Sequence, residues 1–316
     1  MKTETFLSLI LGVSLLISGT LGEASGNGQR ANSSERILNG DRVDGVIKQV
    51  PWAMSLRQEG RHICGATFVS PMMSGGKVVG WSSESTQPVW AITAAHCVTD
   101  GLTGEIKKPD DFSVYGGVLN LQTGPGEDKG EVQHVAEILV PDGTNQGPAY
   151  NHVTLENDIA LLRLKDSTVS LFPHVRSSIR LPNPREVGFV LRPYTAVHTS
   201  GWGRTSEGGF LSPDLLEVRL PIVDKVTCQK IYAPFGDKIA DSMLCSGYIS
   251  GEYDSCQGDS GGGLFYRPTH LSDELAKPVM LGIVSWGRGC GRSDLFGIYA
   301  NVANLQDWVI DKIEGK

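Results

Sequence analysis

The chain reads Asp-Ser-Cys-Gln-Gly-Asp-Ser-Gly-Gly-Gly over residues 254–263. Within this stretch Ser260 follows a carboxylate and precedes three glycines. Glycine adopts backbone conformations that other residues avoid, and it lets amide N–H groups approach a ligand closely. Amides beside a serine hydroxyl can stabilise a developing oxyanion. The stretch therefore predicts a nucleophile, and because serine alone reacts poorly, another part of the chain must supply a base.

Two stretches upstream offer that base and an acid. His96 directly follows the apolar run of residues 90–95, and Asp158 precedes the apolar run of residues 159–164. Taken singly, a histidine after a strand is usually a core residue, and an aspartate at a strand start is usually a turn residue. The three residues together predict catalysis by an activated serine.

In these motifs, and over residues 37 to about 313, the chain resembles the trypsin-like serine endopeptidases of the chymotrypsin fold. The resemblance implies an all-β chain of two antiparallel six-stranded Greek-key barrels with a C-terminal helix and an active site between the barrels. It implies that Ser260 attacks the scissile carbonyl while His96 takes its proton and Asp158 orients the imidazole. The backbone N–H groups of Gly258 and Ser260 would receive the oxyanion.

Two alternatives compete with this interpretation. Residues 258–262 also fit the Gly-x-Ser-x-Gly elbow of α/β-hydrolases. Those enzymes place the acid and the histidine after the serine, whereas only His270 follows Ser260, and the sequence after Ser260 predicts a strand where the elbow requires a helix. The second alternative is a catalytically inactive homologue of the same fold, and the presence of all three predicted catalytic residues argues against it.

The resemblance also implies a substrate pocket. It places Asp254 at the base of the pocket and Ser285, Trp286, Gly287 and Gly297 along its walls, with the two glycines leaving room for a long side chain. A buried carboxylate is costly unless it is paired. A substrate arginine or lysine would pair with it, so we expect polypeptide substrates that are cleaved after Arg or Lys.

The beginning of the chain predicts export. Residues 1–22 contain Lys2, an apolar run over residues 6–17 and then small residues, which is typical of a secretory signal peptide. The apolar run is too short to span a bilayer, and no later segment approaches the ~20 residues required. We therefore expect a secreted, extracellular protein without a membrane partner.

A short propeptide is expected to follow. Residues 23–36 contain no large apolar side chain, so they cannot contribute to a core, and they include a glycosylation sequon at Asn32. The Arg36–Ile37 bond resembles the family's activation site, so residues 37–316 would form the protease domain and a trypsin-like protease would cut the bond. The freed amino group of Ile37 would pair with Asp259, and His62 would be an interim partner for Asp259 before the cut.

From residue 51 onward, short apolar runs alternate with turn residues, and this pattern predicts a barrel or sandwich rather than alternating strands and helices. The predicted strands are 52–56, 67–70, 89–93, 112–115, 131–139, 159–164, 196–201, 215–220, 263–266, 279–286 and 297–300. Only residues 301–313 show helical spacing. Three segments, 72–87, 99–110 and 267–277, are expected to be long loops that narrow substrate choice.

Six cysteines in an exported chain predict three disulfides, and their spacing leaves fifteen pairings open. The resemblance selects Cys64 with Cys97, Cys228 with Cys245, and Cys256 with Cys290. The chain-entropy model assigns roughly 3–4 kcal/mol of stabilisation to each.

The remaining expectations concern partners and cofactors. The net charge of −7 argues against nucleic acid as a partner. We expect no cofactor and no metal for catalysis, and we expect protein protease inhibitors as partners. The family's calcium loop is not recognisable around residues 117–120, because the expected acids are missing. Phe296 stands where trypsins commonly have a proline, and an aromatic residue at this position accompanies a sodium site in some relatives. Neither a calcium site nor a sodium site is established by these residues.

Overall fold

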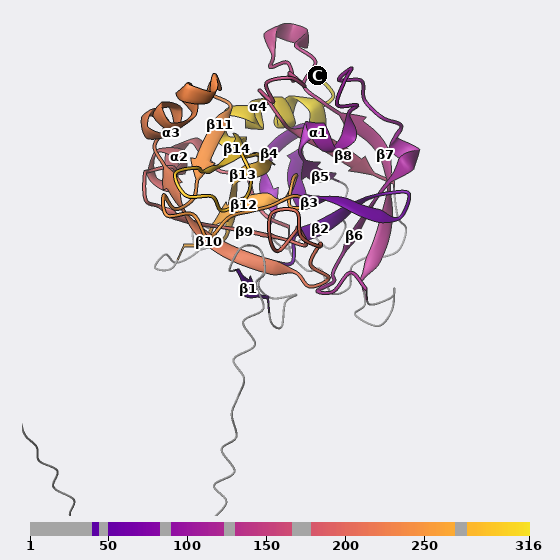
Figure 1. The fold of residues 1–316 in the computed structure, drawn as a ribbon. Coiled ribbons are helices and arrows are strands. Elements are labelled where there is room, and N and C mark those ends of the chain that lie inside the picture. The colour runs from indigo at the N-terminus through magenta and orange to yellow at the C-terminus, as the bar shows by residue number, and fades with distance from the viewer. Residues whose placement is uncertain (1–39, 44–49, 83–89, 123–129, 166–177, 269–276) are drawn as a thin grey trace, which may run out of the picture. The chain divides into compact units, whose positions relative to one another are not determined.

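The computed structural model describes residues 40–43, 50–82, 90–122, 130–165, 178–268 and 277–316, which lie in the unit spanning Glu35–Lys316. The predicted signal peptide, propeptide, Asn32 sequon, Arg36–Ile37 bond and His270 lie outside these residues. Two antiparallel sheets dominate the fold and are seen side by side in Figure 1.

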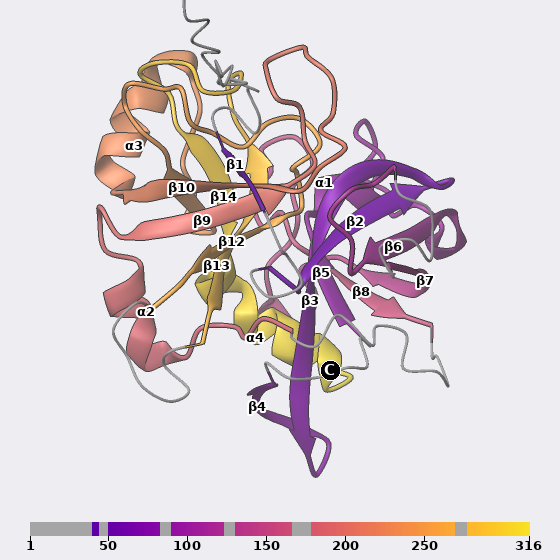
Figure 2. The ribbon, with the colours of Figure 1, turned by 90° about the horizontal axis from the view of Figure 1, so that it is seen from below.

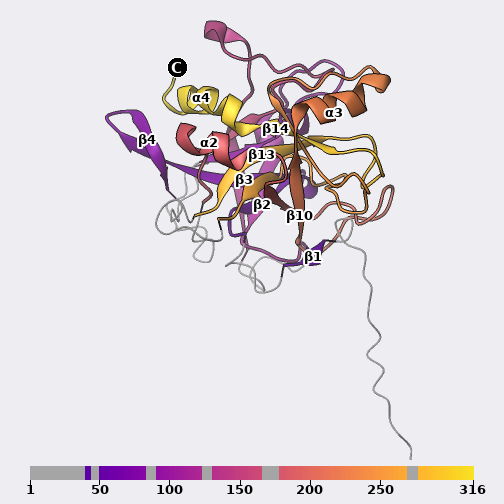
Figure 3. The same ribbon diagram turned by 90° about the vertical axis from the view of Figure 1, so that its left-hand side faces the viewer.

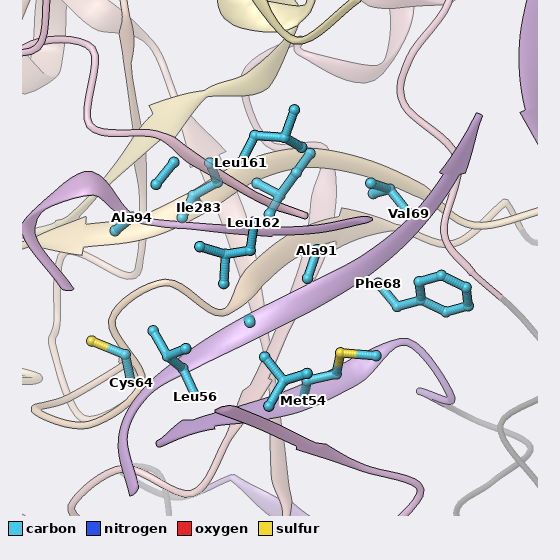
Figure 4. Close-up of a cluster of buried hydrophobic side chains, with 14 of the residues drawn as sticks. Met54, Leu56, Cys64, Phe68, Val69, Ala91, Ala94, Leu161, Leu162 and Ile283 are labelled. Carbon is cyan, nitrogen blue, oxygen red and sulfur yellow. The ribbon is translucent and has the colours of Figure 1, made fainter. Parts of the chain in front are cut away.

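The first sheet is formed by residues 53–164. Its strands are β2 (Ala53–Gln58), β3 (Arg61–Ser74), β4 (Lys77–Ser82), β5 (Trp90–Thr93), β6 (Phe112–Gly116), β7 (Glu131–Leu139) and β8 (Ala160–Leu164). The strand order is β2-β6-β7-β8-β5-β3-β4, and a further pairing of β2 with β3 closes six of these strands into a barrel. Side chains such as Met54, Leu56, Phe68 and Leu162 fill its interior (Figure 4).

The second sheet is built mainly from residues 196–301. It contains β1 (Asp41–Arg42), β9 (Ala196–Gly201), β10 (Leu216–Val223), β11 (Met243–Ser246), β12 (Gly263–Tyr266), β13 (Val279–Trp286) and β14 (Gly297–Asn301). Pairing of β9 with β10 closes six strands into the second barrel, and β1 is an extra strand at the edge of β10. The predicted all-β chymotrypsin fold with two six-stranded barrels is confirmed.

The helices of the described chain are short, and the first of them is largely buried. They are α1 (Ala95–Val98), α2 (Pro184–Val190), α3 (Lys225–Tyr232) and α4 (Val302–Ile313), with 3-10 turns η2 (Pro109–Asp111), η3 (Thr144–Gln146) and η4 (Ala233–Phe235). The C-terminal helix agrees with its prediction and buries Leu305, Trp308 and Val309. The prediction that only residues 301–313 are helical is wrong. Helices α2 and α3 also form, because the side chains of Asn183 and Asp224 cap their N-termini, although neither segment has a long apolar periodicity.

The segment expected as a loop over residues 72–87 is instead a hairpin as far as Ser82. Strand β4 pairs antiparallel with the end of β3, and both project away from the barrels in Figures 2 and 3. Gly75 and Gly76 have φ values of 58° and 76°, which suit a two-residue hairpin turn. The backbone N–H of Val78 donates to Glu314 Oε1 at 2.8 Å, so the hairpin is attached to the C-terminal end of the chain.

Three disulfides connect distant parts of the fold: Cys64–Cys97, Cys228–Cys245 and Cys256–Cys290. These are the pairings that the resemblance implies. The first attaches β3 to the turn that carries His96, and the third attaches the Ser260 loop to the segment after β13. In the described part of the chain, every helix is too short or too polar to cross a membrane.

Candidate active site

Both barrels contribute to the candidate site. His96 lies in α1, immediately after β5, and Asp158 lies two residues before β8, so both belong to the first barrel. Ser260 lies on the loop between β11 and β12 of the second barrel. The site therefore lies where the two barrels meet.

The His96–Asp158 pair has the geometry of a base and its orienting acid. His96 Nδ1–H donates to Asp158 Oδ2 at 2.8 Å, and the His96 backbone N–H donates to Asp158 Oδ1 at 2.9 Å. The Ser285 hydroxyl adds a third hydrogen bond to Oδ2 at 2.5 Å. With the proton fixed on Nδ1, the lone pair of Nε2 is available to accept a proton. Burial opposes ionisation of the imidazole, but the attraction to Asp158 and the hydrogen bond with it together outweigh burial and raise the pKa of His96.

Backbone hydrogen bonds hold Ser260 in place. Its carbonyl accepts from the Gly65 N–H at 2.7 Å, and the next residue, Gly261, donates to the Val284 carbonyl at 2.8 Å. Within the described residues no hydrogen bond joins Ser260 Oγ to His96, whose Nε2 lies 3.7 Å from Cys97 Sγ. Such contacts commonly tighten only when substrate is bound. A Cβ atom on Gly261 would lie 2.2 Å from Thr93 Oγ1 and 3.2 Å from the Ala94 nitrogen, so the Ser260 loop packs against the residues just before His96.

The amides beside Ser260 are available for an anion. Gly258 has a φ of 98°, and neither its N–H nor that of Ser260 donates to another group in the described part of the chain. His62 fixes the Gly258 carbonyl, because its Nε2–H donates to that oxygen at 3.0 Å while its Nδ1 accepts from the Ser55 hydroxyl at 2.8 Å. Burial lowers the pKa of His62 to about 4, so the ring is neutral at pH 7. Its expected contact with Asp259 is absent from the described structure.

Asp259 is the carboxylate that directly precedes Ser260 in the sequence. Its side chain is buried and accepts from the Gly203 N–H at 2.8 Å and the Cys256 N–H at 2.9 Å. Burial raises the pKa of Asp259 to about 6, and among the described residues no cation pairs with it. A Cβ atom at Gly203 would lie 2.4 Å from the Asp259 carboxyl, so this position requires glycine. Sequence reasoning missed Gly203, which lies 56 residues before its partner.

A cavity of about 200 Å³ opens beside Ser260. Asp254 lines it, and its Oδ2 accepts from the Gly291 N–H at 2.9 Å while its Oδ1 is buried without a partner in the described structure. Burial raises the pKa of Asp254 to about 7. A Cβ atom at Gly297 would lie 2.9 Å from Oδ1, so a side chain there would fill the space in front of the carboxylate. The other residues expected in the pocket also line the cavity: Ser285, Trp286 and Gly287.

One group of potential metal ligands lies at the site. The ligand atoms of Cys64, His96 and Cys97 all lie within 4.8 Å of one another. Both cysteines are joined in a disulfide, however, so they offer no thiolates to a metal. The donor chemistry of this group therefore does not fit a metal site.

Two barrels with a histidine–aspartate pair and a glycine-flanked serine where they meet define a chymotrypsin-fold serine protease. The Trypsin family model matches residues 83–309. Trypsin zeta of Drosophila melanogaster is 36% identical over 87% of this chain and 84% of its own length, and Trypsin 5G1 of Aedes aegypti is 31% identical over 88% and 85%. Mannan-binding lectin serine protease 1 of Homo sapiens is 32% identical over 87% of this chain but 35% of that protein. The chain belongs to the trypsin family of serine proteases, which need no cofactor for catalysis.

Proposed function

We propose that this protein is a secreted endopeptidase, made as a zymogen, that hydrolyses peptide bonds after arginine or lysine. The observation that carries the proposed specificity is the cavity shared by Ser260 and Asp254, where one carboxylate oxygen is buried and has no partner in the described part of the chain. A guanidinium or ammonium group entering the cavity would supply that partner and favour the ionised carboxylate.

The proposed reaction uses residues from both barrels. Ser260 Oγ attacks the scissile carbonyl, and His96 Nε2 accepts its proton and transfers it to the leaving amine. Asp158 holds the proton on Nδ1 and stabilises the imidazolium that forms. The N–H groups of Gly258 and Ser260 stabilise the oxyanion, and the loss of one such donor typically lowers turnover by about 10²–10³-fold.

Asp259 supports the proposed activation. A buried carboxylate that accepts two hydrogen bonds, with no cation beside it among the residues that the structure describes, is incompletely compensated. Cleavage after Arg36 by a trypsin-like protease would create a charged amino group on Ile37 that can pair with Asp259. We propose secretion because the apolar run of residues 6–17 near the start of the chain is typical of a signal peptide. Polypeptides with Arg or Lys at the cleaved bond are the proposed substrates, and protein protease inhibitors are proposed partners.

Profiling on a peptide library tests the specificity. The protein is first treated with trypsin, and the added trypsin is then removed. We expect the treated protein to cleave after Arg and Lys, while Ser260→Ala remains folded and inactive. Wild-type protein should also be labelled at Ser260 by an organophosphorus reagent. A folded protein that is neither labelled nor active would instead be an inactive homologue.

Activation has a separate test. Arg36→Gln should remain weakly active after a limited treatment with trypsin that activates the wild-type precursor. Full activity of the uncleaved variant would show that Asp259 is compensated in another way and that residues 23–36 do not control activity.

A further inference from the structure

One exposed ion pair connects the turn of residues 204–211 to the loop between β13 and β14. Glu207 Oε2 accepts from Arg292 Nε at 2.8 Å, and Glu207 Oε1 accepts from Arg292 Nη2 at 2.5 Å. The pair is bidentate, and it joins residues that are 85 positions apart in the sequence. Exposed ion pairs usually contribute little to stability, but bidentate arginine–carboxylate pairs are the geometrically specific exception.

The Arg292 end of this pair lies beside the specificity pocket. Gly291, the preceding residue, donates its N–H to Asp254 Oδ2 at 2.9 Å. Gly289 lines the cavity and lies against the ion pair, because a Cβ atom built on it would come within 2.3 Å of Arg292 Nε and 2.7 Å of Glu207 Oε2. A shift of Arg292 would therefore move the backbone that holds the pocket carboxylate.

The Glu207 end lies in a short turn that packs on the oxyanion loop. Arg204, at the start of the turn, donates its N–H to the Gln257 carbonyl at 2.8 Å and bridges to Leu211 at the end of the turn. The Leu211 side chain lies over Gly258, since a Cβ atom on that glycine would be 2.6 Å from Leu211 Cδ2. The turn thus contacts the residue whose N–H is proposed to bind the oxyanion.

We infer that the Glu207–Arg292 pair is a positioning pair that attaches the Asp254 side of the pocket to the loop before Ser260. The inference rests on the proposed function, because it assumes that Asp254 binds the substrate side chain. The pair also neutralises Arg292 near a pocket proposed for cations. Loss of Glu207 should therefore weaken binding more than loss of Arg292, since it leaves an unpaired positive charge beside the entering side chain.

The test measures kcat and KM for an arginine peptide amide and the inhibition constant of benzamidine, which occupies only the pocket. Glu207→Gln and Arg292→Gln should each raise KM and the benzamidine constant by about two- to fivefold, with kcat changed less than about twofold. The double variant should be no worse than the poorer single variant, because both substitutions remove one interaction. Exchanging the charges with Glu207→Arg and Arg292→Glu together should restore most of the loss.

The control is Glu137→Gln, which breaks the similarly exposed Arg163–Glu137 pair on the outside of the first barrel. It should change none of these constants. The inference is overturned if the Glu207 and Arg292 variants match wild type, or if their effects add in the double variant. A wild-type enzyme that neither cleaves after arginine nor binds benzamidine would overturn the proposed specificity and this inference together, so the two failures can be told apart.

Discussion

Asp158 and Asp254 are both buried aspartates of the same site, but their surroundings differ. Asp158 accepts three hydrogen bonds, from the His96 backbone, the His96 ring and the Ser285 hydroxyl. Asp254 accepts one from Gly291 on Oδ2, and its Oδ1 has no partner within the described residues. A carboxylate proposed only to orient a base can be satisfied by the chain itself, whereas one proposed to bind a cationic side chain needs an oxygen that the chain leaves without a partner.

The largest expected effect follows from replacing the fully paired aspartate. Asp158→Asn should lower kcat by about 10⁴-fold, because an amide facing Nδ1 favours the wrong tautomer of His96. KM for an arginine substrate should change little, since the pocket is untouched. Steady-state kinetics with active-site titration would check this, and a kcat within tenfold of wild type would show that Asp158 does not orient the base.

Replacing the incompletely paired aspartate should affect binding instead. Asp254→Ser should lower kcat/KM for arginine and lysine substrates by about 10²–10³-fold, which matches the several kcal/mol typical of a lost buried charge pair. The variant should still react with an organophosphorus reagent at the wild-type rate, because the catalytic residues remain intact. Wild-type efficiency on arginine substrates would remove Asp254 from the pocket.

The pH dependence should separate the two carboxylates further. Burial raises the pKa of Asp254 to about 7 in the empty pocket, and a cationic side chain binds only the ionised form. KM for arginine substrates should thus be constant above pH 8 and rise by up to about tenfold per pH unit well below pH 7. A KM for arginine substrates that stays constant down to pH 5 would contradict this expectation.

The decrease of kcat at low pH should have a different origin from the rise of KM. It should reflect His96, whose pKa Asp158 raises against the effect of burial. The dependence of KM on pH should disappear in Asp254→Ser, while kcat of that variant should still decrease at low pH. Initial-rate measurements between pH 5 and pH 9 would separate the two effects.

The smallest effect is expected for one of the three donors to Asp158. Ser285→Ala removes the hydroxyl bond but leaves both bonds from His96, so the carboxylate should keep its orientation. We expect kcat to fall by about tenfold, which corresponds to the lower end of about 1.5 kcal/mol for one hydrogen bond to a charged group that remains otherwise satisfied. A loss as large as that of Asp158→Asn would mean that the hydroxyl bond, rather than His96, sets the orientation.

Short sequence motifs predicted the parts of the site that involve neighbouring residues. The runs around His96, Asp158 and Ser260 combine strands, turns and reactive side chains within a few positions, so the motifs and their resemblance to a known family were enough to predict these residues as catalytic. The contacts of His62 with Ser55 and Gly258 were beyond such patterns, because they depend on where β2, β3 and the Ser260 loop lie in space.

Local sequence patterns also predicted only part of the fold. Eleven of the twelve barrel strands were predicted, because most alternate or are continuously apolar. The four-residue strand β11 was missed, and β3 is longer than the predicted 67–70. The β3–β4 hairpin was interpreted as a loop because Gly75 and Gly76 read as loop residues and a bulge near Met72 and Met73 interrupts the alternation. Helix α3 was missed because it buries few side chains, and only its cap at Asp224 marks its start in the sequence.

The hydrogen bonds around Ser260 connect folding to activity. Gly65 of the first barrel binds the Ser260 carbonyl, while Gly261 binds Val284 of the second barrel. A Cβ atom on Gly65 would lie 2.8 Å from Gly262 Cα, so the two backbones pass in direct contact. Separation of the barrels would break these contacts and disperse the catalytic residues in the same event. A chain that has folded only one barrel should therefore lack proteolytic activity, so measured activity would itself report that the two halves have assembled.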